Sequence, residues 1–254
     1  MALPASGAIS LSQVNVELAL ASTTVINMNQ ATVRTLFGVP SGAISMSNGY
    51  GKSAGPTVIG QAFGGGFYAG KIAVGGGGTA THYLIVAPKA SGENSSKQWK
   101  TTNTSTAGTS SDIDGPTNSA NMNNASHPAA QFCEALSIGG YTDWYMPTKN
   151  ELEVCYYFLK PTTTVNNTVS GFNGYAVSPE PISTNHSSGS PAQTSATAFQ
   201  TGNAEAFAAA PAGYWSSTGL GAPAAWGQYF YDGNQYGASK SISYYVRAVR
   251  RVPI

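Results

Sequence analysis

The chain carries very little charge. Only 9% of its 254 residues are Asp, Glu, Lys or Arg, against about 25% in an average globular protein. The formal net charge is +1, which gives no electrostatic footprint for nucleic acid or for an anionic membrane. Disordered chains usually have more charge and fewer aromatic residues. The aromatic fraction of 11% therefore predicts a folded protein with a neutral, polar surface.

Long apolar runs are missing as well. No stretch approaches the roughly 20 apolar residues of a membrane-spanning helix, so we expect no membrane insertion. The first residues lack the basic start and the apolar run of a secretory signal. The Asn-x-Ser/Thr triplets at 94–96 and 124–126 then follow by chance from a composition rich in Asn, Ser and Thr.

Cysteine is scarce: only Cys133 and Cys155 occur. Each lies in an expected helix, with apolar neighbours at i, i+3 and i+4 spacing. Because a free Cys behaves as a small apolar residue, we expect two buried thiols in one core. A disulfide or a metal site is the alternative, although no CxxC pair or His/Cys cluster favours a metal.

Residues that would support catalysis are scattered. His82, His127 and His186 lie in separate segments without a nearby pattern of acid and nucleophile. We expect a capping or surface role for His127, which precedes a helix. Residues 49–53 end in Gly-Lys-Ser, but the first glycine of a phosphate-binding loop is absent. The sequence therefore predicts neither an enzyme nor a cofactor.

Carboxylates are too sparse to predict a calcium site. Calcium takes several oxygen ligands from clustered carboxylates, whereas residues 227–245 contain only Asp232. Asp112 and Asp114 form a pair in a Ser-rich loop, which is weak support for a cation. We expect no bound metal.

Residues 1–53 read as a separate unit. Ser10 and Gln13 fit a capping box and predict a short helix. A second helix is expected from about Asn29 to a stop at Gly38. The unit is too small for a strong core of its own, so we expect it to pack against a partner chain.

The same unit contains a short repeat. Ser-Gly-Ala-Ile-Ser occurs at 6–10 and again at 41–45. Two copies are too few for a solenoid. They predict two similar extended segments that flank the helix pair.

The remainder divides into a glycine-rich linker or first strands at 54–80 and a domain at 81–254. Polar, irregular stretches separate its expected elements, which are a strand at 83–87, helices at about 128–136 and 148–159, a strand that alternates through 229–231, and a last strand at 246–252.

A set of motifs follows in a characteristic order. It comprises Trp144-Tyr145-Met146-Pro147-Thr148 with Glu151-Leu152, Tyr214-Trp215-Ser216-Ser217, Ala225-Trp226, Gly233-Asn234-Gln235, and Val246-Arg247-Ala248-Val249-Arg250. Over roughly residues 65–254 the chain resembles the C-type-lectin-like domains at the ends of bacterial collagen-like adhesins and in bacteriophage virion proteins. Residues 1–53 are similar to the N-terminal parts of phage structural and tail-associated proteins.

The resemblance implies an α+β fold with two helices, a small antiparallel sheet and long loops. Family members include proteins that diversify the surface before the Val-Arg-x-Val-Arg strand while keeping a framework. The implied framework here is Trp226, Phe230, Gly233, Gln235, Val246 and Val249. The implied ligand-facing set is Tyr229, Tyr231, Asn234, Tyr236, Ser239, Tyr244 and Tyr245, some of which could instead be ordinary sheet packing.

Three of the four arginines, Arg247, Arg250 and Arg251, crowd the end of the chain. They could form a basic edge that contacts a receptor. The hypothesis we favour is structural: an arginine paired with a carboxylate such as Glu151 would hold the last strand to the second helix.

The resemblance implies a virion protein, a tail or fibre adhesin that binds a host-surface glycan or protein through an aromatic, neutral patch. Residues 1–53 would contact other virion subunits, and a homotrimer is expected because closed symmetry is the norm for homo-oligomers. The alternative is a decoration, neck or baseplate protein whose lectin-like domain packs between subunits. An enzyme related to the formylglycine-generating sulfatase activators is disfavoured, because no cysteine follows Cys155.

Overall fold

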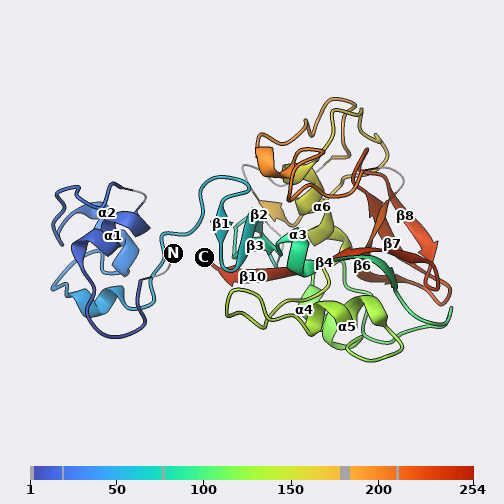
Figure 1. The fold of residues 1–254 in the computed structure, drawn as a ribbon, viewed down its shortest axis with the longest axis horizontal. Helices are drawn as coiled ribbons and strands as arrows, with labels where there is room; N and C mark the ends of the chain where they lie inside the picture. The colour runs from blue at the N-terminus through green and yellow to red at the C-terminus, as the bar shows by residue number, and fades with distance from the viewer. Residues whose placement is uncertain (1–2, 19, 76–77, 178–183, 210–211) are drawn as a thin grey trace. The chain divides into compact units, whose positions relative to one another are not determined.

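The structure is a computed structural model (Figure 1). It describes residues 3–18, 20–75, 78–177, 184–209 and 212–254. Residues 76–77 of the expected linker, and residues 178–183 and 210–211 of the expected irregular stretch, lie outside the described residues. Two compact units divide the chain, Met1–Gly55 and Pro56–Ile254, and each is described by itself.

The small unit contains two short helices, α1 (Leu11–Glu17) and α2 (Ala31–Phe37), and the 3-10 helix η1 (Met46–Gly49). The capping box between Ser10 and Gln13 is present, and Gly38 ends α2 in the left-handed conformation. Both predictions are confirmed. The unit has a core of its own, made of Leu3, Ile9, Val14, Ile26, Val33, Leu36 and Phe37.

The two copies of Ser-Gly-Ala-Ile-Ser have matching local structures. The second residue of each copy is a glycine at positive φ, Gly7 at 87° and Gly42 at 80°. Each ends in an extended serine, Ser10 or Ser45, which forms a capping box at the start of the next helix. The repeat therefore encodes the same entry into a helix twice, once for α1 and once for η1.

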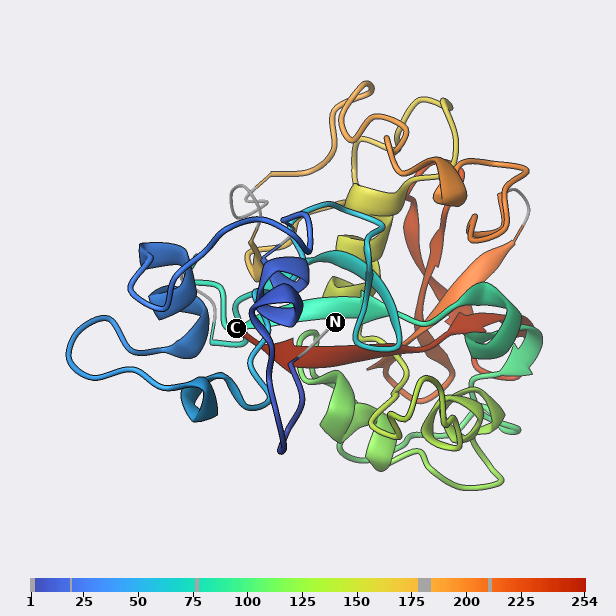
Figure 2. The same cartoon turned by 60° about the vertical axis from the view of Figure 1, so that its left-hand side comes forward.

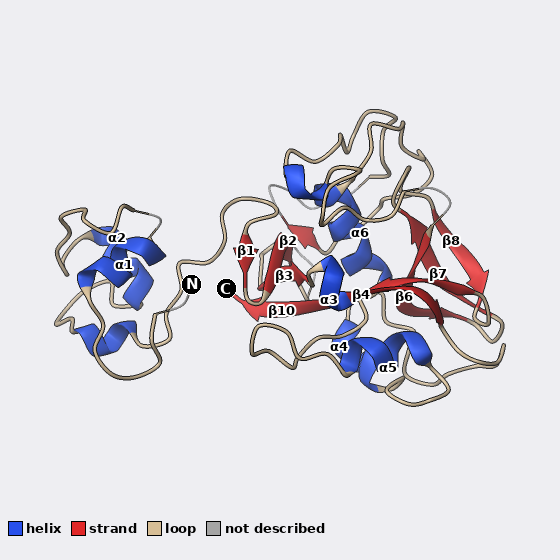
Figure 3. Ribbon diagram, viewed as in Figure 1, coloured by secondary structure: helices blue, strands red, loops and turns tan. Residues whose placement is uncertain are grey.

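The described residues of the large unit form two five-stranded sheets (Figure 3). The first sheet has the order β1 (Ala62–Phe63), β2 (Gly66–Ile72), β3 (His82–Val86) and β10 (Val249–Pro253), with β5 (Ala176–Val177) paired to β2. The second has the order β4 (Glu93–Gln98), β9 (Ser243–Arg247), β6 (Gly213–Leu220), β7 (Ala224–Tyr229) and β8 (Gln235–Ser239). The fold is mixed α+β, and β6 and β9 form a parallel pair among antiparallel ones.

The last strand expected from the sequence is two strands in two sheets. β9 ends at Arg247, β10 begins at Val249, and Ala248 lies between them. The Ala248 amide donates to the Gly92 carbonyl at 3.0 Å, and its carbonyl accepts from the Ala87 amide at 2.9 Å. Ala87 precedes and Gly92 ends the short helix α3 (Lys89–Gly92). This helix separates β3 from β4, as Ala248 separates β9 from β10. The chain thus changes sheets at one residue without losing backbone hydrogen bonds.

Helices cover the strands from two sides (Figure 2). On one side α6 (Lys149–Leu159) packs against β2, β6 and β7, and on the other α4 (Gly115–Ala120) and α5 (Pro128–Glu134) pack against β4, β6 and β9. A further 3-10 helix, η2, spans Thr197–Phe199. Each side has its own buried cluster, one with Leu152, Tyr156, Tyr214 and Phe230, the other with Trp99, Trp144, Trp215 and Val246. Within the residues that the structure describes, no helix is long and apolar enough to span a bilayer.

Two expectations about single residues need correction. Cys133 and Cys155 are free and buried, but they lie in different cores, because α5 and α6 cover opposite sides of the strands. His127 occupies the N-cap position of α5, without a side-chain capping bond, and it is 5% exposed rather than at the surface. Its ring hydrogen bonds to Thr106 and Asn124, so its role is internal.

Candidate functional site

Four of the predicted ligand-facing residues form one continuous aromatic surface. The ring centroids of Tyr229 and Tyr236 are 4.4 Å apart in a stacked arrangement. Tyr231 extends the row at 5.5 Å from Tyr229, and Tyr244 at 6.0 Å from Tyr236. All four side chains are half-buried. We call these four residues the tyrosine ladder.

Strand register brings the ladder together. Tyr229 of β7 lies opposite Gly213 of β6, and Tyr236 of β8 lies opposite Gly227 of β7. A Cβ atom on Gly213 would overlap the Tyr236 hydroxyl, and one on Gly227 would lie 3.3 Å from its ring. The two glycines therefore leave the space in which the Tyr236 ring lies flat against the sheet.

One end of the ladder rests on a buried tryptophan. Trp215 is fully buried, its ring lies 4.8 Å from Tyr244, and its indole N–H donates to the Lys97 carbonyl at 3.0 Å. Aromatic pairs of this kind contribute roughly 0.5–1.5 kcal/mol beyond their burial. The base of the ladder is therefore held rigidly.

The other three predicted ligand-facing residues lie apart from the ladder. Tyr245 faces the opposite side of the sheet and packs on Tyr214 at 5.2 Å, because it is adjacent to Tyr244 and neighbouring side chains in a strand point to opposite faces. Ser239 donates to Asn103 at 3.0 Å. Asn234 lies in the turn between β7 and β8, where its backbone N–H donates to the Asp232 carboxylate.

The predicted framework residues differ in burial. Phe230 is fully buried and stacks on Phe207 with centroids 3.9 Å apart. Tyr229 and Tyr231 on either side of it are half-buried, so the expected alternation holds although β7 ends at Tyr229. Val246, Val249 and Gly233 are buried, whereas Trp226 and Gln235 are half-buried. The Lys149 ammonium lies 4.1 Å from the centre of the Trp226 ring.

A buried polar group supports the turn that carries the ladder. Gly233 has φ of 76°, and a Cβ there would collide with the rings of Tyr156 and His186. His186 meets Glu153 of α6 at 2.6 Å, with both side chains fully buried. Gln228 of β7 donates to the same carboxylate. The turn is thus bonded to α6, which the sequence did not reveal, because His186 and Glu153 are 33 residues apart.

The ladder is electrically neutral in the physiological range. Burial raises the pKa of the Tyr236 and Tyr244 phenols, and burial with the charge of Asp232 raises the pKa of Tyr231. The Asp232 carboxylate caps the turn through Asn234, and Asp114 caps α4. In the described ranges, no group of three or more His, Cys, Asp or Glu residues could hold a metal ion.

The three C-terminal arginines are internal. Arg251 is the one that bonds to Glu151, at 2.8 Å, which confirms a tie between the last strand and α6. Arg247 instead meets Glu205 at 2.6 Å and lies 3.8 Å from Glu93. β9 and β10 belong to different sheets, so Arg247 faces a different set of carboxylates.

Arg250 forms the third pair. Its Nε and Nη2 atoms donate to the two oxygens of Asp143 at 2.7 and 2.8 Å, and its guanidinium lies 3.9 Å from the centre of the Tyr141 ring. All three guanidiniums are thus occupied by carboxylates. They form part of the framework and offer no basic edge for a receptor.

Comparison with known protein families places part of the chain in a family. The model of the Lcl C-terminal domain family matches residues 93–250, which is more than half of the chain. The match begins at β4 and includes α4, α5 and α6, the tyrosine ladder, and the arginines Arg247 and Arg250. A search of curated proteins finds no significant match. The chain therefore belongs to the Lcl C-terminal domain family.

Proposed function

We propose that this protein is an adhesin whose tyrosine ladder binds a glycan or a protein on the surface of a host cell. Family membership indicates an adhesin-like or tail-fibre-associated function. The observation that carries the proposal is the ladder itself, because four half-buried tyrosines form a continuous neutral surface on a rigid sheet. Tyrosine offers a large amphipathic contact at low entropic cost.

We further propose that the fold is C-type-lectin-like and that the protein is a component of a phage tail or fibre. Two sheets, helices on both sides and long connections agree with the first part. The family match and the resemblance of residues 1–53 to phage tail-associated proteins support the second. The role is binding and not catalysis, since the buried His127 and His186 are engaged by side chains of the fold.

Residues 1–53 are proposed to attach the protein to other virion subunits. Beside its own core, the small unit exposes apolar side chains near the end of α1 and in the loop that follows, with Val16 at 55% and Val25 at 94% exposure. These side chains favour burial against a partner. A homotrimer is our proposal for the assembly, and sedimentation equilibrium of the full chain would measure it directly.

The test of the ladder is a binding comparison with the full-length chain on an array of neutral and charged oligosaccharides. Replacing Tyr229 and Tyr231 together by Ser should lower binding by about tenfold or more, as expected when central aromatic anchors are lost. Phe172→Ser is the matched control, because Phe172 is an aromatic residue with 59% exposure outside the ladder.

The melting temperature must be measured for each variant. Equal binding by the double variant and the parent chain would contradict the proposal. So would an equal loss of binding in Phe172→Ser. If the chain binds no oligosaccharide, the same variants are compared on intact host cells, where loss of adhesion in the double variant alone supports a protein receptor.

The second candidate function is structural, with the large unit packed between virion subunits. The exposed apolar residues of the small unit favour assembly contacts. Labelling assembled particles with a tyrosine-directed reagent separates the two roles. Protection of Tyr229 and Tyr231 in the particle, with reaction in the free chain, would favour packing over host attachment.

A further inference from the structure

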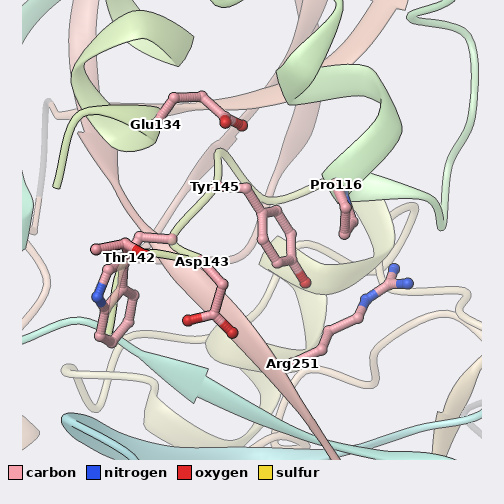
Figure 4. Close-up of a pocket in the computed structure, with 7 residues that line it drawn as sticks. Pro116, Glu134, Thr142, Asp143, Tyr145 and Arg251 are labelled. Atoms are coloured by element: carbon pink, nitrogen blue, oxygen red, sulfur yellow. The ribbon is translucent and has the colours of Figure 1, made fainter. Parts of the chain in front are cut away.

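A second concave site lies away from the tyrosine ladder. It is a pocket of about 220 Å³ between α4, α5, β10 and the segment before α6. Figure 4 shows Glu134, Asp143 and Arg251 arranged around Tyr145. The lining residues are Pro116, Glu134, Thr142, Asp143, Trp144, Tyr145 and Arg251.

Two of the charged groups in the pocket are already paired within the fold. Both oxygens of Asp143 accept hydrogen bonds from Arg250 at 2.7 and 2.8 Å. Arg251 donates to Glu151 at 2.8 Å, and also to the carbonyl of Ile113. Closely spaced opposite charges largely cancel each other's field a few ångströms away. Neither pair gives the pocket a net charge.

Glu134 is different. Within the described part of the chain, no Lys, Arg or His lies within ion-pair distance of its carboxylate. Burial raises the pKa of its carboxyl, and the Ser119 hydroxyl beside it partly offsets that rise. The pocket therefore has one uncompensated negative charge, in a position that is partly removed from water.

The walls beside this charge are mixed: Thr142, Asp143 and Arg251 bring polar groups, and Pro116, Trp144 and Tyr145 bring ring carbons. Trp144 and Tyr145 contribute aromatic rings, although each is only 1–4% exposed, and Pro116 contributes a ring from the first turn of α4. A carboxylate next to aromatic and aliphatic walls is the combination that recognises an organic cation. An anionic ligand would be repelled by the carboxylates of Glu134 and Asp143.

The geometry points to a binding site for a small primary ammonium group on an aliphatic stem. We infer that Glu134 accepts hydrogen bonds from the ammonium, while the exposed ring of Pro116 contacts the stem. A volume of about 220 Å³ corresponds to roughly seven water molecules at about 30 Å³ each. That space accepts a ligand such as n-butylammonium.

The test is a titration of the full-length chain with n-butylammonium, followed by NMR. The reporter is the indole N–H of Trp144, which donates to the Tyr141 carbonyl at 3.2 Å at the pocket wall. A saturable shift of this signal is expected at neutral pH. Butyrate and n-butanol are the matched controls, since they share the stem and lack the positive charge.

Glu134→Gln should weaken n-butylammonium binding by about tenfold, because a hydrogen bond to a charged partner is replaced by one to a neutral amide. Asp232→Asn is the control variant, as it removes one negative charge from the chain far from this pocket. Asp143 is unsuitable for a control variant, because its replacement would leave the Arg250 guanidinium without its carboxylate partner. Binding should also weaken as the pH falls through the pKa of Glu134, which lies above the ordinary value of 4.5.

Three outcomes would overturn the assignment. They are equal shifts with n-butanol, equal affinity of Glu134→Gln and the parent chain, and an equal loss in Asp232→Asn. If n-butylammonium binds as expected, D-glucosamine and cadaverine then distinguish an amino sugar from an alkyl diamine as the source of the ammonium. The parent chain and Glu134→Gln both keep the tyrosine ladder intact, so failure of this assignment leaves the proposed function untouched.

Discussion

The arginine pairs and the tyrosine ladder lie on consecutive stretches of one chain, and they use opposite chemistry. Arg247 is 1% exposed and forms buried hydrogen bonds on all sides. The ladder is half-buried and uncharged, and its rings pack on one another. A chain with few charges places them where they hold strands together, and leaves a neutral surface for contact with other molecules.

The largest expected effect concerns the arginine side of this comparison. Arg247→Ala should lower the free energy of unfolding by about 3–5 kcal/mol, because it leaves the carboxylates of Glu205 and Glu93 without their buried partner. Urea denaturation monitored by tryptophan fluorescence measures the change. Unchanged stability together with lost ligand binding would show that Arg247 belongs to the binding surface.

The next prediction concerns the connection between α6 and the turn of the ladder. Glu153→Leu should cost about 2 kcal/mol, because it leaves the buried donors of His186 and Gln228 unpaired. Hydrogen exchange at the Gly233 amide should accelerate, since this amide lies in the released turn. Glu153→Gln keeps one acceptor and should cost less. Identical exchange rates of the Gly233 amide in the parent chain and both variants would show that α6 does not hold the turn of the ladder.

Acid should weaken the framework through His127. Burial lowers the pKa of His127 to about 4, with smaller contributions from Lys100 and Lys240. The folded state therefore favours the neutral ring, and this contribution is complete above the unfolded pKa of about 6.5. It is lost as the pH falls towards 4, on the order of 1–2 kcal/mol. Unfolding measured at pH 7 and pH 4.5 should show a smaller pH difference in His127→Gln.

The smallest effect on stability is expected in the ladder. Tyr231→Ser should change the free energy of unfolding by only about 0.5 kcal/mol, as is usual for surface positions. Its neighbour Phe230 provides the contrast, since Phe230→Ala should cost about 3–5 kcal/mol. A large loss in Tyr231→Ser would make the tyrosines part of the framework, and the division between the two regions would fail.

Local features of the fold could be predicted from the sequence. The capping boxes at Ser10 and Thr148 and the stop at Gly38 follow from side chains that bond within a few residues. Alternating burial around Phe230 follows from the geometry of an extended chain. The break at Ala248 could not be predicted, because its hydrogen bonds go to Ala87 and Gly92, far away in the sequence.

For the candidate site, the sequence indicated which residues are aromatic, neutral and near the C-terminus. It did not separate Tyr244 from Tyr245, since only pairing with β6 decides which one faces Trp215 and which faces Tyr214. It also left the partner of each arginine open.

The amino-acid sequence by itself determined the low charge, the short-range caps and the concentration of tyrosine, because these depend on composition and on contacts within one turn or strand. The tertiary structure decided which tyrosines join into one surface and which carboxylate each arginine meets. Among the described residues, it also left Glu134 without a cationic partner. These properties depend on strand order and register, which are set by contacts between residues far apart in the chain.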